Sequence, residues 1–358
     1  MSYTDFAADR IAYHKRFFDP KFEEYFTGLK TELDLPEGSL WSKKALELLQ
    51  KFSLAGGKRQ RVAFMYEACG LIESGEEDVQ NASNKLWTAI SIELLQSHLL
   101  IHDDIIDESE LRRGQPTVHI TLTGTMNTRQ ARSVALLAGD ISAYLAINSL
   151  LNANGEISNK LISAQLNAGI ETFWGQIFDL ERDSGEVLTK QQSLVLADYK
   201  AVRSSTYAPM LLGLILASSD TPKNIARIRE FAFACGIAGQ LQDDYLSIFG
   251  DSKVTGKSVL TDIKEGKRTL MVTHTLSKCD RAEKRKLDSI LGNDKITNDE
   301  AKWCRDLFKK YKADDMIRSE AFGWAKKAKN SALNWSDWNQ SSVKFFVGVA
   351  EWFAERNL

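Results

Sequence analysis

The stretch from Ile92 to Thr117, IELLQSHLLIHDDIIDESELRRGQPT, most constrains what this chain can be, because it places three carboxylates within an apolar helical pattern. Each unpaired carboxylate in such surroundings costs on the order of several kcal/mol to desolvate. Asp103 and Asp107 are four residues apart, so they share one helix face and repel each other unless a cation lies between them. Oxygen ligands of this kind suit Mg²⁺, whose shell substrate phosphate can complete. The pattern predicts a metal–phosphate site, although a solvated acidic face is the commoner cause of such a cluster.

Basic residues in and near glycine-containing segments supply the opposite charge. Arg112 and Arg113 follow the acidic cluster, and their forked donors match phosphate oxygens. The segment GGKRQR (56–61) precedes a predicted helix, so its backbone can approach an anion while Lys58 and Arg61 add charge near the helix N-terminus. These segments predict a phosphate-binding surface.

A second acidic pair, Asp243 and Asp244, lies far along the chain in the segment QLQDDYL (240–246). Its neighbours are apolar, which is not expected of solvated carboxylates. If both acidic helices point inward, they face each other across a cavity and can hold several Mg²⁺ ions around one diphosphate. Ion pairs with nearby lysines would explain Asp243 and Asp244 equally well.

Further lysines lie downstream of these motifs. Lys200 falls in the middle of a predicted helix, and Lys257 and Lys267 belong to a glycine-containing loop that could close over a site. A lysine-rich loop is more often plain surface. Several basic segments accompanying two acidic pairs nevertheless favour a diphosphate–metal site, since such a site needs both signs of charge.

Composition and length exclude several classes of protein. The chain has 358 residues, only five prolines and no glycine- or serine-rich linker, so we expect residues 1–358 to form a single domain. A net charge of −2 argues against a nucleic-acid partner. The charged N-terminus does not resemble a signal peptide, and no apolar run approaches the roughly 20 residues that span a bilayer, so we expect no stable membrane insertion. The four scattered cysteines indicate neither zinc site nor disulfide framework, and we expect a cytoplasmic protein.

Apolar residues recur every three or four positions along nearly the whole chain, which predicts an all-α protein, one large helical bundle with a central cavity. Pro209 should bend or interrupt its helix. The pattern Thr297-Asn-Asp-Glu300 is a capping box that opens a helix in the C-terminal third. The expected helices cover Asp5–Leu33, Ser42–Ser53, Arg61–Ser74, Asp78–Glu108, Thr128–Leu151, Ser158–Glu181, Lys190–Ser218, Thr221–Phe249 and Arg268–Leu276.

The order of these motifs resembles that of the trans-isoprenyl diphosphate synthases, or polyprenyl synthases. The resemblance covers about residues 40 to 275. It rests on GGKRQR (56–61), ELLQSHLLIHDDIIDESELRRGQPT (93–117), GQIFDL (175–180), Lys200, GQLQDDYLSIFGD (239–251) and GKSVLTDIKEGKRTL (256–270). It implies the isoprenoid synthase fold and a Mg²⁺-dependent prenyltransferase that condenses isopentenyl diphosphate with an allylic diphosphate.

The resemblance also implies roles for individual residues. Asp103, Asp107 and Asp243 would bind Mg²⁺, with Asp104 and Asp244 in support. The allylic diphosphate would be bound by Arg112, Lys200, Gln240, Lys257 and Lys267, and isopentenyl diphosphate by Lys58, Arg61, Gln96 and Arg113. The residues near the reacting carbons would be Gln176, Asp179 and Gln240. The catalytic residues would be Asp103, Asp107, Lys200, Asp243 and Lys267. The allylic substrate would ionise, the isopentenyl double bond would attack, and diphosphate would take the proton.

Three departures from the family pattern bear on activity. Ser247 stands where many members have a third Asp in the second acidic motif, which removes one supporting carboxylate that Asp251 could replace through water. Ala201 replaces a threonine, and Leu260 replaces a glycine of the loop. None of them removes a residue that the resemblance makes a primary metal ligand.

The residues that precede Asp103 predict the chain length of the product. In the family, the residues four and five positions earlier lie under the growing tail, and here they are Leu99 and His98, with Leu95 one turn further. This pair blocks less space than two aromatics, so we expect geranylgeranyl diphosphate (C20), with farnesyl diphosphate (C15) next. His98 could equally be an ordinary buried histidine.

Two alternative functions stay open, and the resemblance to the family also predicts the oligomeric state. A class I terpene cyclase shares the acidic helix but has no use for GGKRQR. A non-catalytic regulatory subunit of a prenyl synthase is suggested by Ser247 and Ala201. The family is generally dimeric, so we expect a homodimer. The tryptophans Trp324, Trp335, Trp338 and Trp352 are expected only to pack.

Overall fold

The computed structural model describes residues 2–72, 79–183, 187–250, 261–293 and 295–355, and these are almost entirely helical. Strands among them are limited to a short antiparallel hairpin, β1 (Leu111–Arg112) with β2 (Gln115–Pro116). The helices are α1 (Tyr3–Glu32), α2 (Leu40–Leu54), α3 (Gln60–Gly70), α4 (Val79–Ile106), α5 (Val118–Leu122), α6 (Thr128–Leu151), α7 (Gly155–Asp183), α8 (Lys190–Ala197), the π-helix η1 (Asp198–Tyr207), α9 (Ala208–Leu216), α10 (Pro222–Phe249), α12 (Thr261–Lys264), α13 (Leu270–Leu276), α14 (Arg281–Ile290), α15 (Asn298–Lys310), α16 (Ala313–Leu333) and α17 (Gln340–Glu355). The all-α prediction is confirmed.

The sequence places most helix starts correctly because side chains cap them. The Thr221 hydroxyl accepts a hydrogen bond from the Asn224 N–H at the start of α10, where Pro222 occupies the first turn. Thr297 and Glu300 form the expected reciprocal capping box at the start of α15. These caps satisfy backbone donors that would otherwise lack partners at helix ends.

The segment from Lys190 to Leu216 differs from expectation. It stays helical through Pro209, whereas we expected a bend or a break there. The difference arises upstream, where η1 widens into a π-helix that ends just before α9. A wider turn gives room beside the carbonyl that a proline ring would otherwise strike. The irregularity therefore lies around Lys200, one of the expected site residues.

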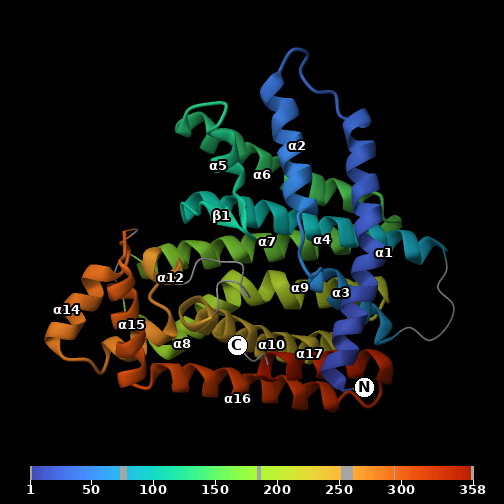
Figure 1. Ribbon diagram of the computed structural model, residues 1–358. Helices are drawn as coiled ribbons and strands as arrows, with labels where there is room; N and C mark the ends of the chain where they lie inside the picture. Colours follow the sequence, from blue (N-terminus) through green and yellow to red (C-terminus); the bar gives the residue numbers. More distant parts are fainter. Residues whose placement is uncertain (1, 73–78, 184–186, 251–260, 294, 356–358) are drawn as a thin grey trace.

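Figure 1 shows the long helices α4, α7, α10 and α16 at successive levels, with α1 crossing them near one end and α14 and α15 at the other. α4 packs along α6, α10 packs along both α16 and η1, and η1 also packs along α7. Phe18, Phe22 and Phe26 of α1 enter one apolar cluster with α2, α4 and α6. Phe231 and Trp335 belong to a second, and α10 contributes to a third together with the helices from α12 to α16. That residues 1–358 form a single domain stays a prediction.

α6 is the one described helix whose length and composition would allow it to cross a membrane, with a mean hydropathy of 1.6 over its most apolar window. The sequence does not show α6 as an uninterrupted apolar run, because this helix contains Arg129, Arg132 and Asp140. A core helix of a bundle meets the same criteria, and 44% of the window is buried against its neighbours.

A buried carboxylate fixes α3, the helix that follows GGKRQR. Glu67 is 1% exposed, and it accepts hydrogen bonds from Arg10 Nε on α1 and from Ser342 Oγ on α17, at 2.6 and 3.1 Å. The His14 Nε2 atom lies 2.7 Å away. Burial opposes ionisation of Glu67, but its bonds with His14 and Arg10 outweigh burial and lower its pKa. Both ends of the chain are thereby attached to α3.

Gly175, the first residue of the GQIFDL segment, lets α7 and η1 approach closely. A Cβ atom at this position would lie 2.3 Å from the backbone nitrogen of Lys200 and 2.6 Å from its Cα. These are backbone atoms, so a rotamer change cannot relieve the contact, and any side chain would push the two helices apart.

We predict that Gly175→Ala lowers the free energy of unfolding by about 1–3 kcal/mol, the usual cost of overpacking a tight contact. Gly323→Ala is the matched control, since a Cβ at that helical position would meet no atom within 4 Å. It should leave stability equal or slightly higher, because alanine favours helix. Urea unfolding of both variants measures the difference, and equal stabilities would contradict the close packing of α7 on η1.

Candidate active site

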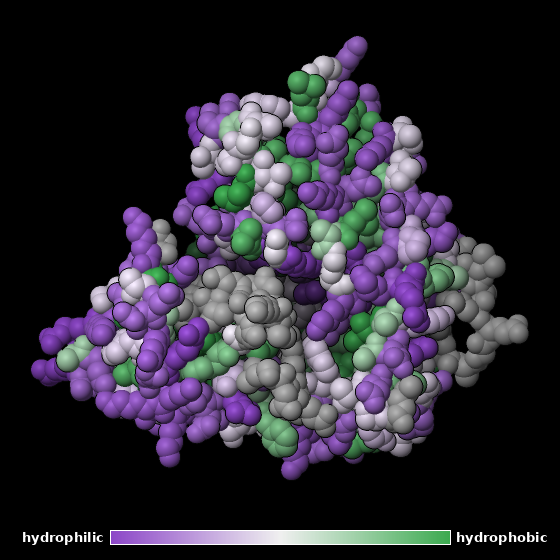
Figure 2. Space-filling view, in the orientation of Figure 1, coloured by the Kyte–Doolittle hydropathy of each residue, from purple (hydrophilic) through white to green (hydrophobic). Residues whose placement is uncertain are grey.

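A cavity of about 740 Å³ lies between α4, α7, η1 and α10, and both acidic motifs contribute to its wall. Asp103 of α4 and Asp243 of α10 line this one space, together with Lys200 and Lys267. Figure 2 shows a recess near the middle of the molecule with polar residues along its upper edge. Two acidic segments 140 residues apart in sequence are therefore brought to a common site, as the sequence predicted.

Arg112 fixes the first acidic cluster from behind. Its Nη2 lies 3.0 Å from Asp103 Oδ2 and its Nε lies 2.6 Å from Asp104 Oδ1. Asp104 is 1% exposed, and its Oδ2 has no hydrogen-bond partner among the described residues. Burial raises the pKa of Asp104 to about 6, although Arg112 opposes the rise. Arg112 is not among the residues that line the cavity, so in this structure it orients the carboxylates.

Two lysines approach the same carboxylates from other elements. Lys200 Nζ bonds Asp179 of α7 and lies 3.6 Å from Asp103 Oδ1. Lys267 Nζ lies 2.9 Å from Asp107 Oδ2 and also bonds Glu265. Burial opposes the charge of both lysines, but the surrounding carboxylates raise their pKa values, so both ammonium groups stay charged.

A carboxylate from outside the second acidic motif, Asp262 of α12, lies beside it and was not predicted from the sequence. Gln240 Nε2 donates to Asp244 Oδ1 at 2.8 Å. Ser247, the residue that replaces the family's third Asp, donates its hydroxyl to Asp262 of α12. Burial and the neighbouring Asp262 raise the pKa of Asp244. Asp262 belongs to the lysine-containing segment GKSVLTDIKEGKRTL (256–270), and its negative charge is the sequence signal that identifies it.

The GGKRQR segment forms the opposite, basic part of the site. Gly56 and Gly57 have φ values of +72° and +108°, a backbone conformation that favours glycine. Arg113 Nη1 donates to the carbonyl oxygens of Ala55 and Gly56 at 2.9 and 3.0 Å, which fixes Arg113 against this loop. The β-hairpin that follows α4 thus carries Arg112 to the carboxylates and Arg113 to the basic loop.

The positive charge of Arg61 in this basic part is only partly neutralised by neighbouring carboxylates. Burial and then the charge of Arg113 lower the pKa of Arg61, and Glu93 only partly offsets them. Its Nε is buried without a hydrogen-bond partner among the described residues. Two guanidinium groups that repel each other in a low-dielectric wall favour an anion between them.

The C-terminal helix also contributes, which the sequence reading missed. Trp352 and Phe353 of α17 line the cavity, and Lys58 Nζ lies 4.4 Å from the centre of the Trp352 ring. Our expectation that Trp352 only packs was too narrow, whereas Trp335 does lie in a core cluster. No local pattern could reveal this contact, because it joins residues nearly 300 positions apart.

The three expected chain-length residues have different environments. Leu99 lines the cavity, but Leu95 and His98 do not. His98 is 4% exposed and turns toward α6, where its Nδ1 lies 2.9 Å from the Gly139 carbonyl oxygen. Its ring meets the edge of Phe173, which does line the cavity, at 5.4 Å between centroids. Burial and the nearby His102 lower the pKa of His98 to about 4.

Other expected residues also have places in this site. Gln96 and Ala201 line the cavity, as do the polar residues Gln176, Asp179 and Gln240. Lys257, Leu260 and Asp251 lie outside the described residues. The structure thus groups most of the charged residues named from the sequence.

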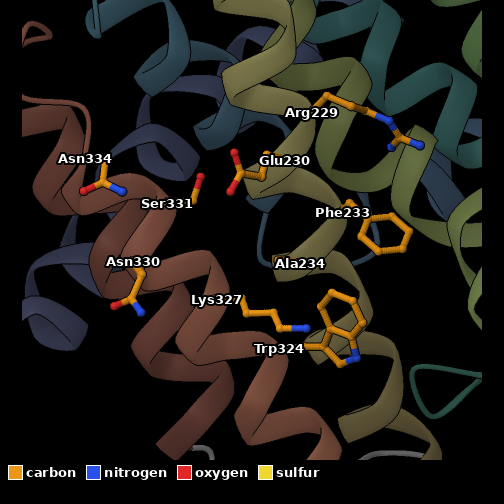
Figure 3. A pocket seen from close by; sticks show the side chains of 9 residues that line it. All are labelled: Arg229, Glu230, Phe233, Ala234, Trp324, Lys327, Asn330, Ser331 and Asn334. Carbon is orange, nitrogen blue, oxygen red and sulfur yellow. The ribbon is translucent and has the colours of Figure 1, made fainter.

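A second hollow, of about 460 Å³, lies between α10 and α16 and is shown in Figure 3. Trp324 and Phe233 meet edge to face along one side, and Lys327 Nζ lies 3.9 Å from the Trp324 ring centre. Its lining has one carboxylate, Glu230, so it offers no opposed acidic pair for a metal–diphosphate site.

Known proteins resemble the chain in both sequence and structure. The family described as polyprenyl synthetase matches residues 42–308. A geranylgeranyl diphosphate synthase of Saccharolobus solfataricus is 30% identical over 72% of this chain and 74% of its own. A short chain isoprenyl diphosphate synthase of Methanocaldococcus jannaschii is 31% identical over 71% and 73%. The crystal structure of a geranylgeranyl pyrophosphate synthetase from Pyrococcus horikoshii has a TM-score of 0.79 and 27% identity, over 98% of both chains.

The matched region, residues 42–308, contains both acidic motifs, the GGKRQR segment and the lysines around the cavity. The agreement between this match and the assembled site settles the family. The chain belongs to the polyprenyl synthetases, the all-helical trans-prenyltransferases.

Proposed function

We propose that this enzyme condenses isopentenyl diphosphate with an allylic diphosphate in the presence of Mg²⁺. The observation that carries the proposal is that one cavity is lined both by Asp103 of α4 and Asp243 of α10 and by Lys58 and Arg61, while Arg113 is held against the loop that precedes α3. Such a cavity suits two diphosphates, one bound through metal ions and one bound directly by cations.

Asp103, Asp107 and Asp243 would hold Mg²⁺, supported by Asp104 and Asp244. The donor set fits, since it consists of carboxylate oxygens and since the Oδ2 atom of Asp104 is buried without a hydrogen-bond partner among the described residues. Asp262, which accepts a hydrogen bond from Ser247, would add a carboxylate beside α10 in place of the missing third Asp. When bound, Mg²⁺ would stabilise the charge that develops on the leaving diphosphate.

The protein's own residues would bind and orient the substrates. Lys200 and Lys267 reach the carboxylates that would hold the allylic diphosphate, and Arg112 fixes those carboxylates. The contact of Lys257 with this diphosphate stays a prediction, because Lys257 lies outside the described residues. Lys58, Arg61, Gln96 and Arg113 would bind isopentenyl diphosphate beside the GGKRQR loop.

Catalysis would follow from this arrangement. The allylic carbon–oxygen bond breaks to give a carbocation, the isopentenyl double bond attacks it, and the released diphosphate accepts the proton. Gln176, Asp179 and Gln240 line the cavity and would lie near the reacting carbons. Apolar lining residues such as Leu99 would exclude water that would quench the cation.

Separate variants should affect the two diphosphate sites differently. We expect Arg61→Gln to raise KM for isopentenyl diphosphate about 10- to 100-fold, the effect of losing a hydrogen bond between charged groups, with little change for the allylic substrate. Asp243→Asn should lower kcat by roughly 100-fold and raise the Mg²⁺ concentration required.

Steady-state kinetics with Mg²⁺, isopentenyl diphosphate and each allylic primer in turn would measure both effects. Lys327→Gln, an exposed change in the second hollow, is the control and should behave as wild type. Equal effects of Arg61→Gln on both substrates, or near-normal turnover in Asp243→Asn, would contradict the assignment.

We further propose geranylgeranyl diphosphate as the main product, with farnesyl diphosphate next. Relatives from Saccharolobus solfataricus and Sulfolobus acidocaldarius are named geranylgeranyl diphosphate synthases, and one from Candida albicans is a farnesyl pyrophosphate synthase. In this chain Leu99 and Phe173 form the wall near the first acidic motif, and His98 supports Phe173 from behind.

His98→Ala should therefore lengthen the products, because removal of the imidazole lets Phe173 move back and deepens the cavity. Chromatographic sizing of the products after dephosphorylation would measure the change. Phe173→Ala should shift the distribution in the same direction, and Ile170→Ala, a change at a residue that does not line the cavity, should not. An unchanged distribution in both His98→Ala and Phe173→Ala would refute this location for the limit on chain length.

A homodimer is supported by an apolar face of α6 and α7 that lacks cover in the monomer. On α7 the exposed residues recur at alternating intervals of four and three, which is the spacing of a helix seam. On α6 they include Leu137, Ile141 and Tyr144, the last 79% exposed. We propose that a second copy covers this face, whose α7 members are Leu166, Ile170, Phe173, Ile177 and Leu180, with Trp174 beside them.

Tyr144→Glu combined with Trp174→Glu should convert the dimer to a monomer, since two carboxylates would be buried without partners. Sedimentation velocity measures the mass. Phe322→Glu, a similar change at an exposed residue of α16, should leave the dimer intact. A wild-type monomer at all concentrations would show that this face serves another purpose.

The alternative functions explain less of the structure. A terpene cyclase would leave Arg61, whose Nε is buried without a partner among the described residues, without a ligand. A regulatory subunit would not require Asp103, Asp243, Lys200 and Lys267 to line one cavity. A cytoplasmic location stays a prediction.

A further inference from the structure

A cluster of three residues that could bind a metal ion lies between α4 and α6, and one of them, His102, also lines the main cavity. His98 and His102 are four residues apart on α4, and their ring centroids lie 4.3 Å apart. Asp140 of α6 faces them, with its Oδ1 3.4 Å from His102 Nε2. One ligand atom from each of the three residues lies within 4.8 Å of the other two. Two histidines at this spacing on one helix, with a carboxylate opposite, are an arrangement that binds transition metals.

His98 has a ligand atom that the fold leaves unused. The residue is 4% exposed, and its Nδ1 lies 2.9 Å from the Gly139 carbonyl oxygen. A carbonyl oxygen can only accept, so Nδ1 carries the proton and Nε2 keeps a lone pair. Nε2 is buried and has no hydrogen-bond partner among the described residues. A histidine whose one nitrogen donates to a backbone carbonyl and whose other nitrogen is free is arranged as metal-binding histidines are.

We propose that His98, His102 and Asp140 bind a divalent transition-metal ion such as Zn²⁺. Two imidazole nitrogens and one carboxylate oxygen form a set that suits zinc, with a fourth position for water, and differ from the all-oxygen set that Mg²⁺ prefers. This metal centre is distinct from the carboxylates proposed for Mg²⁺, and nothing in the condensation reaction requires it.

Binding needs only a local adjustment. His102 Nε2 now lies 3.0 Å from the Leu136 carbonyl oxygen, so to become a ligand it would give up that contact and the ring would carry its proton on Nδ1. The side chains of His102 and Asp140 are 23% and 41% exposed in the monomer, and His102 lines the main cavity, which gives an ion a path to the buried Nε2 of His98. Because the ligands come from two helices, the ion would fix α4 to α6 directly beside Asp103.

The experiment uses the full-length protein in excess Mg²⁺, so that the acidic motifs are occupied, and Co²⁺ as the probe. Nitrogen-bound Co²⁺ of low coordination number absorbs visible light far more strongly than six-coordinate Co²⁺ bound by oxygen. We expect an intense band that saturates at one equivalent per chain and that Zn²⁺ abolishes. His98→Gln and Asp140→Asn should each weaken binding at least about tenfold. His274→Gln, a change on α13, is the matched control and should bind as wild type.

A second measurement separates binding from damage to the fold. Zn²⁺ should raise the Tm of the wild-type protein by mass action but not that of His98→Gln. If a variant does not fold, the anomalous signal of zinc in crystals of the wild-type protein decides. Absence of the band in wild type, an undiminished band in His98→Gln, or anomalous signal only at Asp103 and Asp243 would each overturn the proposal.

Discussion

The structure depends on holding like charges together inside a bundle before any substrate is present. Arg61 and Arg113 repel each other beside the basic loop, and Asp244 and Asp262 repel each other in the cavity wall. Some of the elements that carry the charged residues of the site are held by residues that do not line the cavity. Arg59, for example, bonds both Asp19 and Glu93 and fixes the start of α3, and Arg112 fixes the first acidic cluster. Electrostatic groups positioned in advance in this way need little reorganisation when charge develops on a ligand.

Close backbone contacts let these charges converge. The π-helix η1 lies between α7 and α10, and a glycine faces it from each side. A Cβ on Gly175 would strike the backbone at Lys200, and a Cβ on Gly236 of α10 would lie 2.7 Å from a methyl group of Val202. Both glycines therefore allow η1 to lie deep between its neighbours, so that Lys200 reaches Asp103 and Asp179. The GQIFDL motif begins with glycine for this physical reason, which is separate from any contact with substrate.

The sequence was sufficient for the helices and for the two charged groups, because apolar periodicity and the sign of charge are local properties. It was insufficient where tertiary packing decides. His98 and Leu99 are adjacent, yet only Leu99 lines the cavity, since the rotation of α4 about its axis is set by its contact with α6. The π-helix has no local signal, and Trp352 reaches Lys58 only because Glu67 attaches α17 to α3. Such contacts depend on how all the helices pack against one another.

Ser247 illustrates why a departure from a motif must be judged in three dimensions. Read in sequence, it removes a carboxylate and weakens the case for a working enzyme. In the structure, its short side chain leaves room for Asp262 to approach from α12, and its hydroxyl donates to that carboxylate. An aspartate at position 247 would instead face Asp262 with a second negative charge, beside Asp244, whose pKa burial and Asp262 already raise. Serine at this position is therefore compatible with the close approach of Asp262, and a residue from another helix places a carboxylate beside the second acidic motif.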